Sequence, residues 1–166
     1  MKKLSIITVT IILLIGISEL TFAQQSSNQG DISVGGGIAI TTGIGSGGDF
    51  EPGINLNGFY AITDEIRAGA GISIYFGDFS PTEFNIDGHY IFKDEDGLVI
   101  YALAGLGFFS WSFDTGFGSV SFSTSGLNLG AGLEYDLGNM FLFAEPKINT
   151  AAGTPINLAG GVRFRF

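Results

Sequence analysis

Apolar residues alternate with small or polar residues along most of the chain after residue 30, and no stretch of this region repeats apolar residues at helical spacing. In the segment 31–42, for example, Ile38 and Ile40 are separated by a small residue. An alternation of period 2 predicts β-strands with one apolar face. We therefore expect an all-β chain. Its eight predicted strands span residues 31–42, 53–63, 66–76, 83–93, 98–113, 126–136, 140–149 and 155–166.

The connectors between these strands alternate in length. Three are short turns, and four are longer. The short ones are 64–65, 94–97 and 138–139, and the longer ones are 43–52, 77–82, 114–125 and 150–154. Strands of about ten residues, joined by short turns at one end and longer loops at the other, are typical of small membrane barrels. The predicted fold is an eight-stranded antiparallel up-and-down transmembrane β-barrel.

Alternation alone does not say which face of the strands lies inside the barrel, so the choice rests on the residues of each face. The face opposite the large apolar residues consists mainly of Gly, Ala, Ser and Asn. Its glycines include Gly35, Gly37, Gly69, Gly71, Gly130, Gly132 and Gly161. Glycine weakens an exposed strand face, whereas a narrow eight-stranded lumen needs small residues. We therefore expect the polar face inside and the apolar face against lipid.

Titratable residues of both signs share the predicted inward face. They are Arg67, Asp87, His89, Glu134, Asp136, Glu145, Lys147, Arg163 and Arg165. Unpaired buried charges are costly, so these side chains are expected to pair in a lumen charge network that closes the bore. After residue 23 the only other Lys or Arg is Lys93, at a turn. No cation therefore falls on the apolar band, where it would cost roughly 2–4 kcal/mol.

Aromatic residues near the strand ends are expected to form girdles at the two membrane interfaces. The predicted girdle residues are Tyr60, Tyr75, Phe76, Phe92, Tyr101, Trp111 and Tyr135. The strand 98–113 is apolar on both parities, and unless a bulge switches its phase we expect the bulky set outward, because small residues then fill the lumen. The outward set would be Val99, Tyr101, Leu103, Phe109, Trp111 and Phe113, with Ala102, Ala104, Ser110 and Ser112 inside.

The first 23 residues have the pattern of a secretory signal peptide. Two lysines precede an apolar run, 4–17, that leads to a small-residue exit at 21–23. The run is shorter than the roughly 20 residues of a membrane-spanning helix, which disfavours the alternative of an uncleaved anchor. The predicted organisation is a cleaved signal peptide at 1–23, a short N-terminal segment at 24–30 and one barrel domain at 31–166.

Composition excludes several classes of chemistry. The chain has no Cys and a single His, His89, so a thiol nucleophile, Cys-based zinc sites and poly-His metal sites are unavailable. Its 16 acidic against 7 basic side chains argue against a nucleic-acid partner. The loop 43–48 lacks the Gly-Lys-Ser/Thr ending of a phosphate loop, and the acidic turn 94–96 is expected to be solvated. No catalytic residue, cofactor or metal is therefore predicted.

The C-terminal residues 161–166, Gly-Val-Arg-Phe-Arg-Phe, contain two spaced aromatic residues with Phe last. This segment resembles the assembly signal of the eight-stranded outer-membrane β-barrel proteins of Gram-negative bacteria, the OmpA-like transmembrane domains and OmpX-like barrels. The resemblance covers the chain after the signal peptide and departs from the family pattern at Ala159, where a polar residue is usual. It implies that the barrel-assembly machinery reads Gly161, Phe164 and Phe166. It also implies a monomer in the lipid of the cell outer membrane.

A structural or surface-interaction role without catalysis follows from this reading. The lipid A deacylases among such barrels carry a His-x-Ser motif, but Tyr90 and Ile91 follow His89. We expect His89 to pair with Asp87 or Glu134 in the lumen. Recognition would lie in the loops, whose ligand the sequence does not identify. The charges assigned to these loops are Asp49, Glu51, Asp78, Glu83 and Asp114.

Two alternatives stay open at this point. The first is a barrel that passes or binds small hydrophobic molecules, like the OmpW-type barrels. Its support is that four large apolar residues fall on the parity predicted to face inward: Leu106, Phe108, Phe141 and Phe143. The second is a soluble lipocalin-like carrier with its apolar face inside. The lipocalin Gly-x-Trp near the first strand is absent, however, and the single Trp is Trp111 in the fifth strand.

Overall fold

The computed structural model describes residues 28–42, 50–76, 81–114, 119–151 and 153–166. The predicted signal peptide at 1–23 and most of the predicted segment 24–30 lie outside these residues. Within the described part, no helix is long and apolar enough to cross a lipid bilayer.

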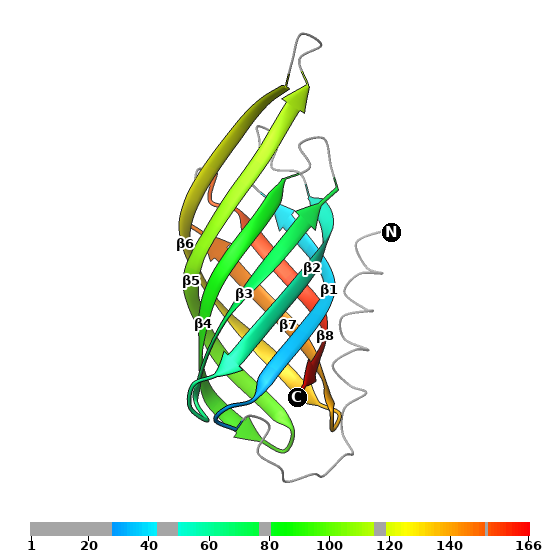
Figure 1. Cartoon of the computed structure of the whole chain (residues 1–166), viewed down its shortest axis with the longest axis vertical. Helices are drawn as coiled ribbons and strands as arrows, with labels where there is room; N and C mark the ends of the chain where they lie inside the picture. Colours follow the sequence, from blue (N-terminus) through cyan, green and yellow to red (C-terminus); the bar gives the residue numbers. More distant parts are fainter. Residues whose placement is uncertain (1–27, 43–49, 77–80, 115–118, 152) are drawn as a thin grey trace, which may run out of the picture.

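Eight antiparallel strands form one closed barrel in chain order (Figure 1). Their bounds are β1 (Ile32–Thr42), β2 (Glu51–Ala61), β3 (Ile66–Tyr75), β4 (Thr82–Glu95), β5 (Leu98–Asp114), β6 (Ser119–Asp136), β7 (Met140–Asn149) and β8 (Ile156–Arg165). Each strand pairs with its neighbours in sequence, and β1 pairs with β8 to close the sheet. The predicted all-β, up-and-down topology is confirmed.

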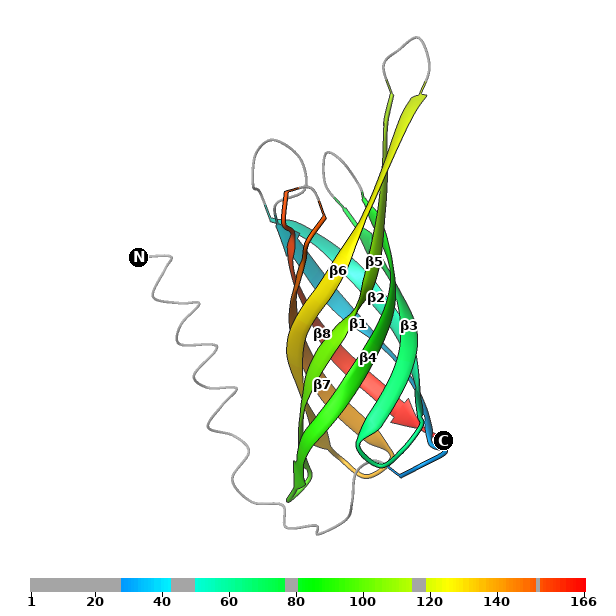
Figure 2. The same ribbon diagram turned by 90° about the vertical axis from the view of Figure 1, so that its left-hand side faces the viewer.

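The two ends of the barrel differ in their connectors. The short turns and both ends of the described chain lie at one end, which we call the turn end. The strand ends that the longer connectors join lie at the other end, which we call the loop end (Figure 2). At the turn end, for instance, the Gly30 amide donates to the Ala61 carbonyl oxygen at 2.8 Å. This separation of short and long connectors matches the one expected from the sequence.

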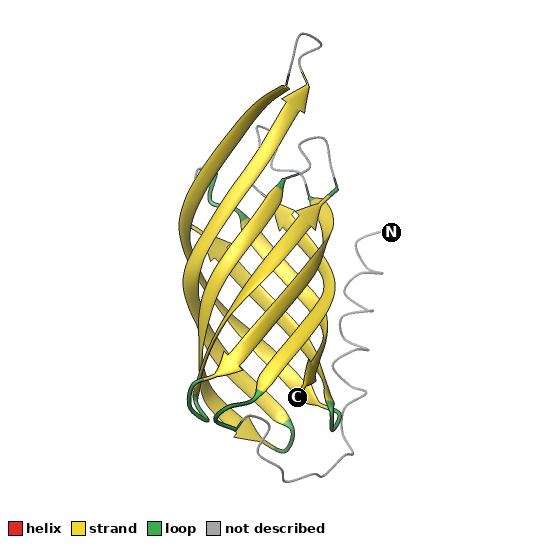
Figure 3. Ribbon diagram, viewed as in Figure 1, coloured by secondary structure: helices red, strands yellow, loops and turns green. Residues whose placement is uncertain are grey.

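A hairpin of β5 and β6 rises above the rest of the barrel at the loop end (Figure 3). The two strands stay paired beyond Ser110, where the pairing of β5 with β4 ends. The predicted connector 114–125 is therefore too long, because its second half belongs to β6. The sequence of that half is Ser-Val-Ser-Phe-Ser-Thr-Ser. It alternates with period 2, as a strand does, but its many serines are also typical of a loop.

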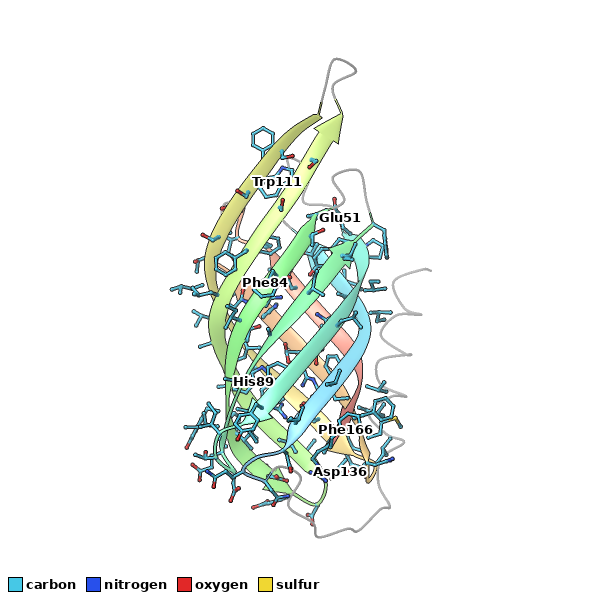
Figure 4. The ribbon with its side chains drawn as sticks, in the orientation of Figure 1. Glu51, Phe84, His89, Trp111, Asp136 and Phe166 are labelled. Carbon is cyan, nitrogen blue, oxygen red and sulfur yellow. The ribbon has the colours of Figure 1, made fainter. Side chains whose placement is uncertain are left out.

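The two faces of the barrel wall carry opposite kinds of side chain (Figure 4). Large apolar residues point outward, and Ile38, for example, is 70% exposed. In the middle of the described strands no outward position carries a charged side chain. Lipid can surround such a band, whereas exposure of the same apolar area to water is unfavourable. The predicted orientation is confirmed, and it is opposite to that of a soluble carrier with an apolar interior.

The facing predicted for the fifth strand is wrong. The set Val99, Tyr101, Leu103 and Phe109 is buried in the lumen, and Ala102 and Ala104 point outward. Space for a large ring inside comes from the paired strand, because a Cβ at Gly132 would clash with Cζ and the hydroxyl of Tyr101. A bulge between Ile91 and Lys93 also shifts the register of β4 against β5. A glycine on a neighbouring strand therefore decides which parity of this apolar strand fits inside.

Glycine also forms the seam where the last strand meets the first. Gly37 on β1 pairs with Gly161 on β8. A Cβ at Gly161 would lie 2.6 Å from Gly37 Cα, closer than real Cβ atoms approach, so the strands reach this spacing only without a side chain there. Phe166 completes the seam, since its amide donates to the Ile32 carbonyl oxygen at 2.8 Å.

Candidate functional site in the barrel lumen

Four charged side chains meet in the lumen, nearer the turn end than the loop end. We call Arg67, Glu134, Glu145 and Arg163 the central charge cluster; they lie on β3, β6, β7 and β8. Arg67 binds Glu134 through two parallel hydrogen bonds, Nη1 to Oε2 at 2.8 Å and Nη2 to Oε1 at 2.7 Å. Arg163 donates to both carboxylates, to Glu134 through Nη1 and to Glu145 through Nη2 at 2.9 Å. Two cations and two anions thus neutralise one another with charge-assisted geometry.

Aromatic rings surround the central charge cluster. The Tyr101 hydroxyl donates to Glu145 at 2.7 Å and accepts from Arg163 at 3.1 Å. The guanidinium of Arg67 lies 4.6 Å from the centroid of the Tyr101 ring, and that of Arg163 lies 4.1 Å from the centroid of Phe143. Contacts between a cation and a ring face stabilise a desolvated guanidinium. The rings and the ion pairs together fill the bore at this level.

His89 lies beside the central charge cluster inside the barrel (Figure 4). Its expected pairing with Asp87 or Glu134 is wrong. Arg67 Nε donates to His89 Nδ1 at 3.0 Å, and His89 Nε2 lies 3.8 Å from Glu145 Oε2. Because a guanidinium occupies the Nδ1 lone pair, that nitrogen is not free to take a proton from a substrate. Among the described residues no group of three His, Asp or Glu side chains is arranged to hold a metal ion.

A second group of polar side chains fills the lumen towards the loop end. Lys147 Nζ lies 3.3 Å from Glu83 Oε1 and 3.6 Å from Asp87 Oδ2. Tyr75 donates its hydroxyl proton to Glu83 at 2.9 Å, and the Asn128 amide donates to Asp87 at 2.8 Å. We call these five side chains the upper polar cluster. The two carboxylates share one cation, Lys147, and each also accepts a hydrogen bond from a neutral donor, as buried carboxylates require.

Asparagine amides link several strands at the level of the upper polar cluster. Asn149 donates to Asn128 at 2.6 Å, and Asn128 donates to Asn85 at 2.8 Å. Asn157 accepts from the Thr41 hydroxyl and donates to the Glu83 carboxylate. Hydrogen-bonded side chains therefore continue the filling of the lumen above the central charge cluster.

Seven of the nine predicted network residues lie in these two clusters or beside them. The two others, Asp136 and Arg165, lie at the turn end. Asp136 Oδ1 accepts from the Gly138 amide at 2.6 Å, and Arg165 Nε lies 3.7 Å from Asp31 Oδ2. Both occupy the last residue of a strand. At that position an inward parity no longer brings a side chain to the centre of the lumen.

The sequence also assigns Glu51 and Glu83 to surface loops, and this assignment is wrong. Both side chains are buried, Glu83 completely. Glu83 shares the parity of Asn85 and Asp87 on β4, and this parity was the signal that could have placed it in the lumen. Three other predicted loop charges lie outside the described side chains: Asp49, Asp78 and Asp114.

Only part of the predicted aromatic girdle faces lipid. Tyr75 and Tyr101 are buried in the lumen, which corrects their assignment. Trp111 lies on the inner face of the β5–β6 hairpin, where it packs against Phe109 and Ala151. The predicted girdle residues on the outward parity are Tyr60, Phe76, Phe92 and Tyr135. The first three of these are more than half exposed.

Little free volume is left in the lumen at the turn end. A cavity of about 20 Å³ lies there against Arg67, Glu134 and Arg163. This volume holds about one water molecule. Phe141 and Phe143 also point inward, but the guanidinium of Arg165 lies 5.0 Å from the Phe141 centroid and Arg163 covers Phe143. Leu106 and Phe108 on β5 point outward instead. The four residues proposed to line an apolar passage therefore do not share one face of the barrel wall.

Replacing Tyr101 with Phe is expected to lower the free energy of unfolding by about 1–3 kcal/mol, because Glu145 then loses a buried donor. Urea unfolding of the refolded protein in lipid vesicles measures the change. Tyr90→Phe is the matched control, because the Tyr90 side chain points outward and is 52% exposed. Equal stability of the two variants would contradict a role of the Tyr101 hydroxyl in holding the cluster.

No protein-family model matches the chain, and no curated protein matches its sequence. Solved structures do match it. The N-terminal β-barrel domain of OprF from Pseudomonas aeruginosa has a TM-score of 0.69 at 20% identity and covers 84% of this chain and 100% of that chain. Ail, the attachment invasion locus protein of Yersinia pestis, has a TM-score of 0.65 at 20% identity, covering 83% and 99%. Neisserial surface protein A has a TM-score of 0.63 at 20% identity, covering 82% and 96%.

Proposed function

Because the chain has the fold of the small eight-stranded outer-membrane β-barrels, we propose that it is an integral outer-membrane protein with a structural or surface-interaction role, a closed lumen and no catalytic activity. One observation carries this proposal: an uncharged outward band surrounds a bore that the central charge cluster fills. Eight strands enclose an interior just wide enough for side chains. The outer surface and the loop end are then the parts that can contact other molecules.

The ends of the barrel support an orientation in the membrane. In outer-membrane barrels the short turns face the periplasm and the longer connectors face the outside, which puts the β5–β6 hairpin on the cell surface. The signal peptide at 1–23 would export the chain, and the barrel-assembly machinery would insert it as a monomer into outer-membrane lipid. Recognition of the last strand by this machinery is supported by Phe164 and Phe166, because their side chains point outward and are 43% and 78% exposed.

Separate observations support the two halves of the proposed role. The β5–β6 hairpin offers a surface beyond the membrane, and two similar proteins are named as an attachment invasion locus protein and as a surface protein. The absence of catalysis is supported by His89, whose Nδ1 accepts a hydrogen bond from Arg67.

Two measurements on membrane-extracted protein test the proposal. On a denaturing gel the unboiled protein is expected to run at a different position from the boiled protein, because a closed barrel resists detergent. In planar bilayers the purified monomer is expected to show no steady conductance, because side chains fill the bore. A steady ion current would contradict the closed lumen. An unshifted band found only in the soluble periplasmic fraction would contradict membrane insertion.

A further inference from the structure

An open groove lies on the outer face of the barrel near the loop end, across the neighbouring strands β4, β5 and β6. Its volume is about 360 Å³. Outward side chains that line it are Thr82, Phe84, Phe108, Ser110, Ser123 and Ser125. Figure 4 labels Phe84 at this level and Trp111 in the hairpin above it. We call this feature the outer groove.

The lower wall of the outer groove is aromatic. The ring centroids of Phe84 and Phe108 lie 6.3 Å apart, with an angle of 37° between the ring planes. Both side chains are more than two fifths exposed. Below them the outward face continues with Leu106 on β5 and Leu127 on β6, which belong to the apolar band. The lower wall is therefore continuous with the surface that faces lipid chains in the proposed function.

The upper wall of the outer groove consists of hydroxyl groups. Ser110, Ser123 and Ser125 are exposed, and their hydroxyls have no side-chain hydrogen bond within the described part of the chain. Ser112 and Ser121, further along the same face, instead hydrogen bond to each other at 3.0 Å. The groove hydroxyls are thus available to a ligand both as donors and as acceptors.

The described residues of the lining include no Lys or Arg, which favours one of two kinds of amphiphile. A phosphate headgroup is usually held by guanidinium or ammonium groups, and this lining supplies none. A sugar ring offers hydroxyls that can pair with serines and an apolar face that can pack on an aromatic ring. We propose that the outer groove binds the uncharged sugar headgroup of an outer-leaflet glycolipid, with its acyl chains along Phe84 and Phe108. This inference rests on the proposed insertion in the outer membrane.

Lipid retention by the intact barrel tests this inference. The protein is reconstituted in nanodiscs holding equal amounts of monoglucosyldiacylglycerol and phosphatidylglycerol with identical acyl chains, and is then extracted in mild detergent for native mass spectrometry. One retained glucosyl lipid is expected, enriched about tenfold over phosphatidylglycerol, since several hydrogen bonds of ordinary strength give a factor of this size. The triple variant S110A/S123A/S125A is expected to lose the enrichment.

The matched control is the double variant S112A/S121A, which removes hydroxyls from the same face outside the outer groove and is expected to retain the glucosyl lipid. Retention of both lipids in equal amounts, preference for phosphatidylglycerol, or an unchanged enrichment in the triple variant would each overturn the inference. A boiling-dependent gel shift of every variant shows that the barrel is intact. If that shift is missing in the unmodified protein, the proposed function fails as well; if it is present without lipid selectivity, only this inference fails.

Discussion

Replacing Glu134 with Gln is expected to lower the free energy of unfolding by about 3–5 kcal/mol. Glu134 is 2% exposed, and both Arg67 and Arg163 donate hydrogen bonds to it. Without this carboxylate, Glu145 alone would face two guanidinium groups in the central charge cluster. A buried charge left without its partner is far more costly than the loss of an exposed pair. Urea unfolding in lipid vesicles measures the difference.

The control for this experiment is Glu95→Gln. Glu95 Oε2 lies 3.5 Å from Lys93 Nζ at the turn end, and the Glu95 side chain is 73% exposed. An exposed pair of this kind contributes little, so the control is expected to unfold like the unmodified protein. Equal unfolding midpoints for the Glu134 and Glu95 variants would show that the central charge cluster does not hold the barrel together.

Replacing Gly161 with Val is expected to cost about 3 kcal/mol and to lower the fraction of protein that shifts on boiling. The seam between β1 and β8 has no room for a side chain at this position, since a Cβ would lie 2.6 Å from Gly37 Cα. The obstacle is backbone, so no rotation of a side chain can relieve it. Refolding from urea into detergent micelles, followed by gels with and without boiling, measures the closed fraction.

Gly160→Val provides the neighbouring control. A Cβ at Gly160 would lie 3.4 Å from the Phe143 carbonyl oxygen, a nearly ordinary contact, so this barrel is expected to close. Refolding of purified protein needs no assembly machinery, which separates closure of the seam from recognition of the C-terminal signal. Normal closure of the Gly161 variant would contradict the steric account of the seam.

The strands could be predicted because their alternation is a local property of the sequence. The fifth strand lacked this signal, since large apolar residues occupy both of its parities. The position of Tyr101 depends on Gly132, which is distant in sequence and becomes its neighbour only in the paired register of β5 and β6. The hairpin was missed for a different reason: serine is frequent in loops, although the serines of 119–125 follow a strand period.

The composition of the lumen was also predictable, whereas its pairings were not. Parity alone assigns Arg67, Glu134 and Arg163 to one face. The contacts among them depend on the stagger of several strands, which no single segment encodes. His89 illustrates this point, because it lies directly across from Arg67 in the β3–β4 register and therefore pairs with that residue rather than with Asp87 two positions away.

The central charge cluster draws its four members from β3, β6, β7 and β8, and its second guanidinium lies on the strand that is synthesised last. Before β8 joins, Glu134 and Glu145 share only Arg67, and the central charge cluster carries one excess anion. Docking of Arg163 removes that excess in the same event that seals the sheet edge. Neutrality of this cluster and closure of the sheet are thus coupled, and a seven-stranded intermediate is destabilised in lipid both by its open edge and by the excess charge of the cluster.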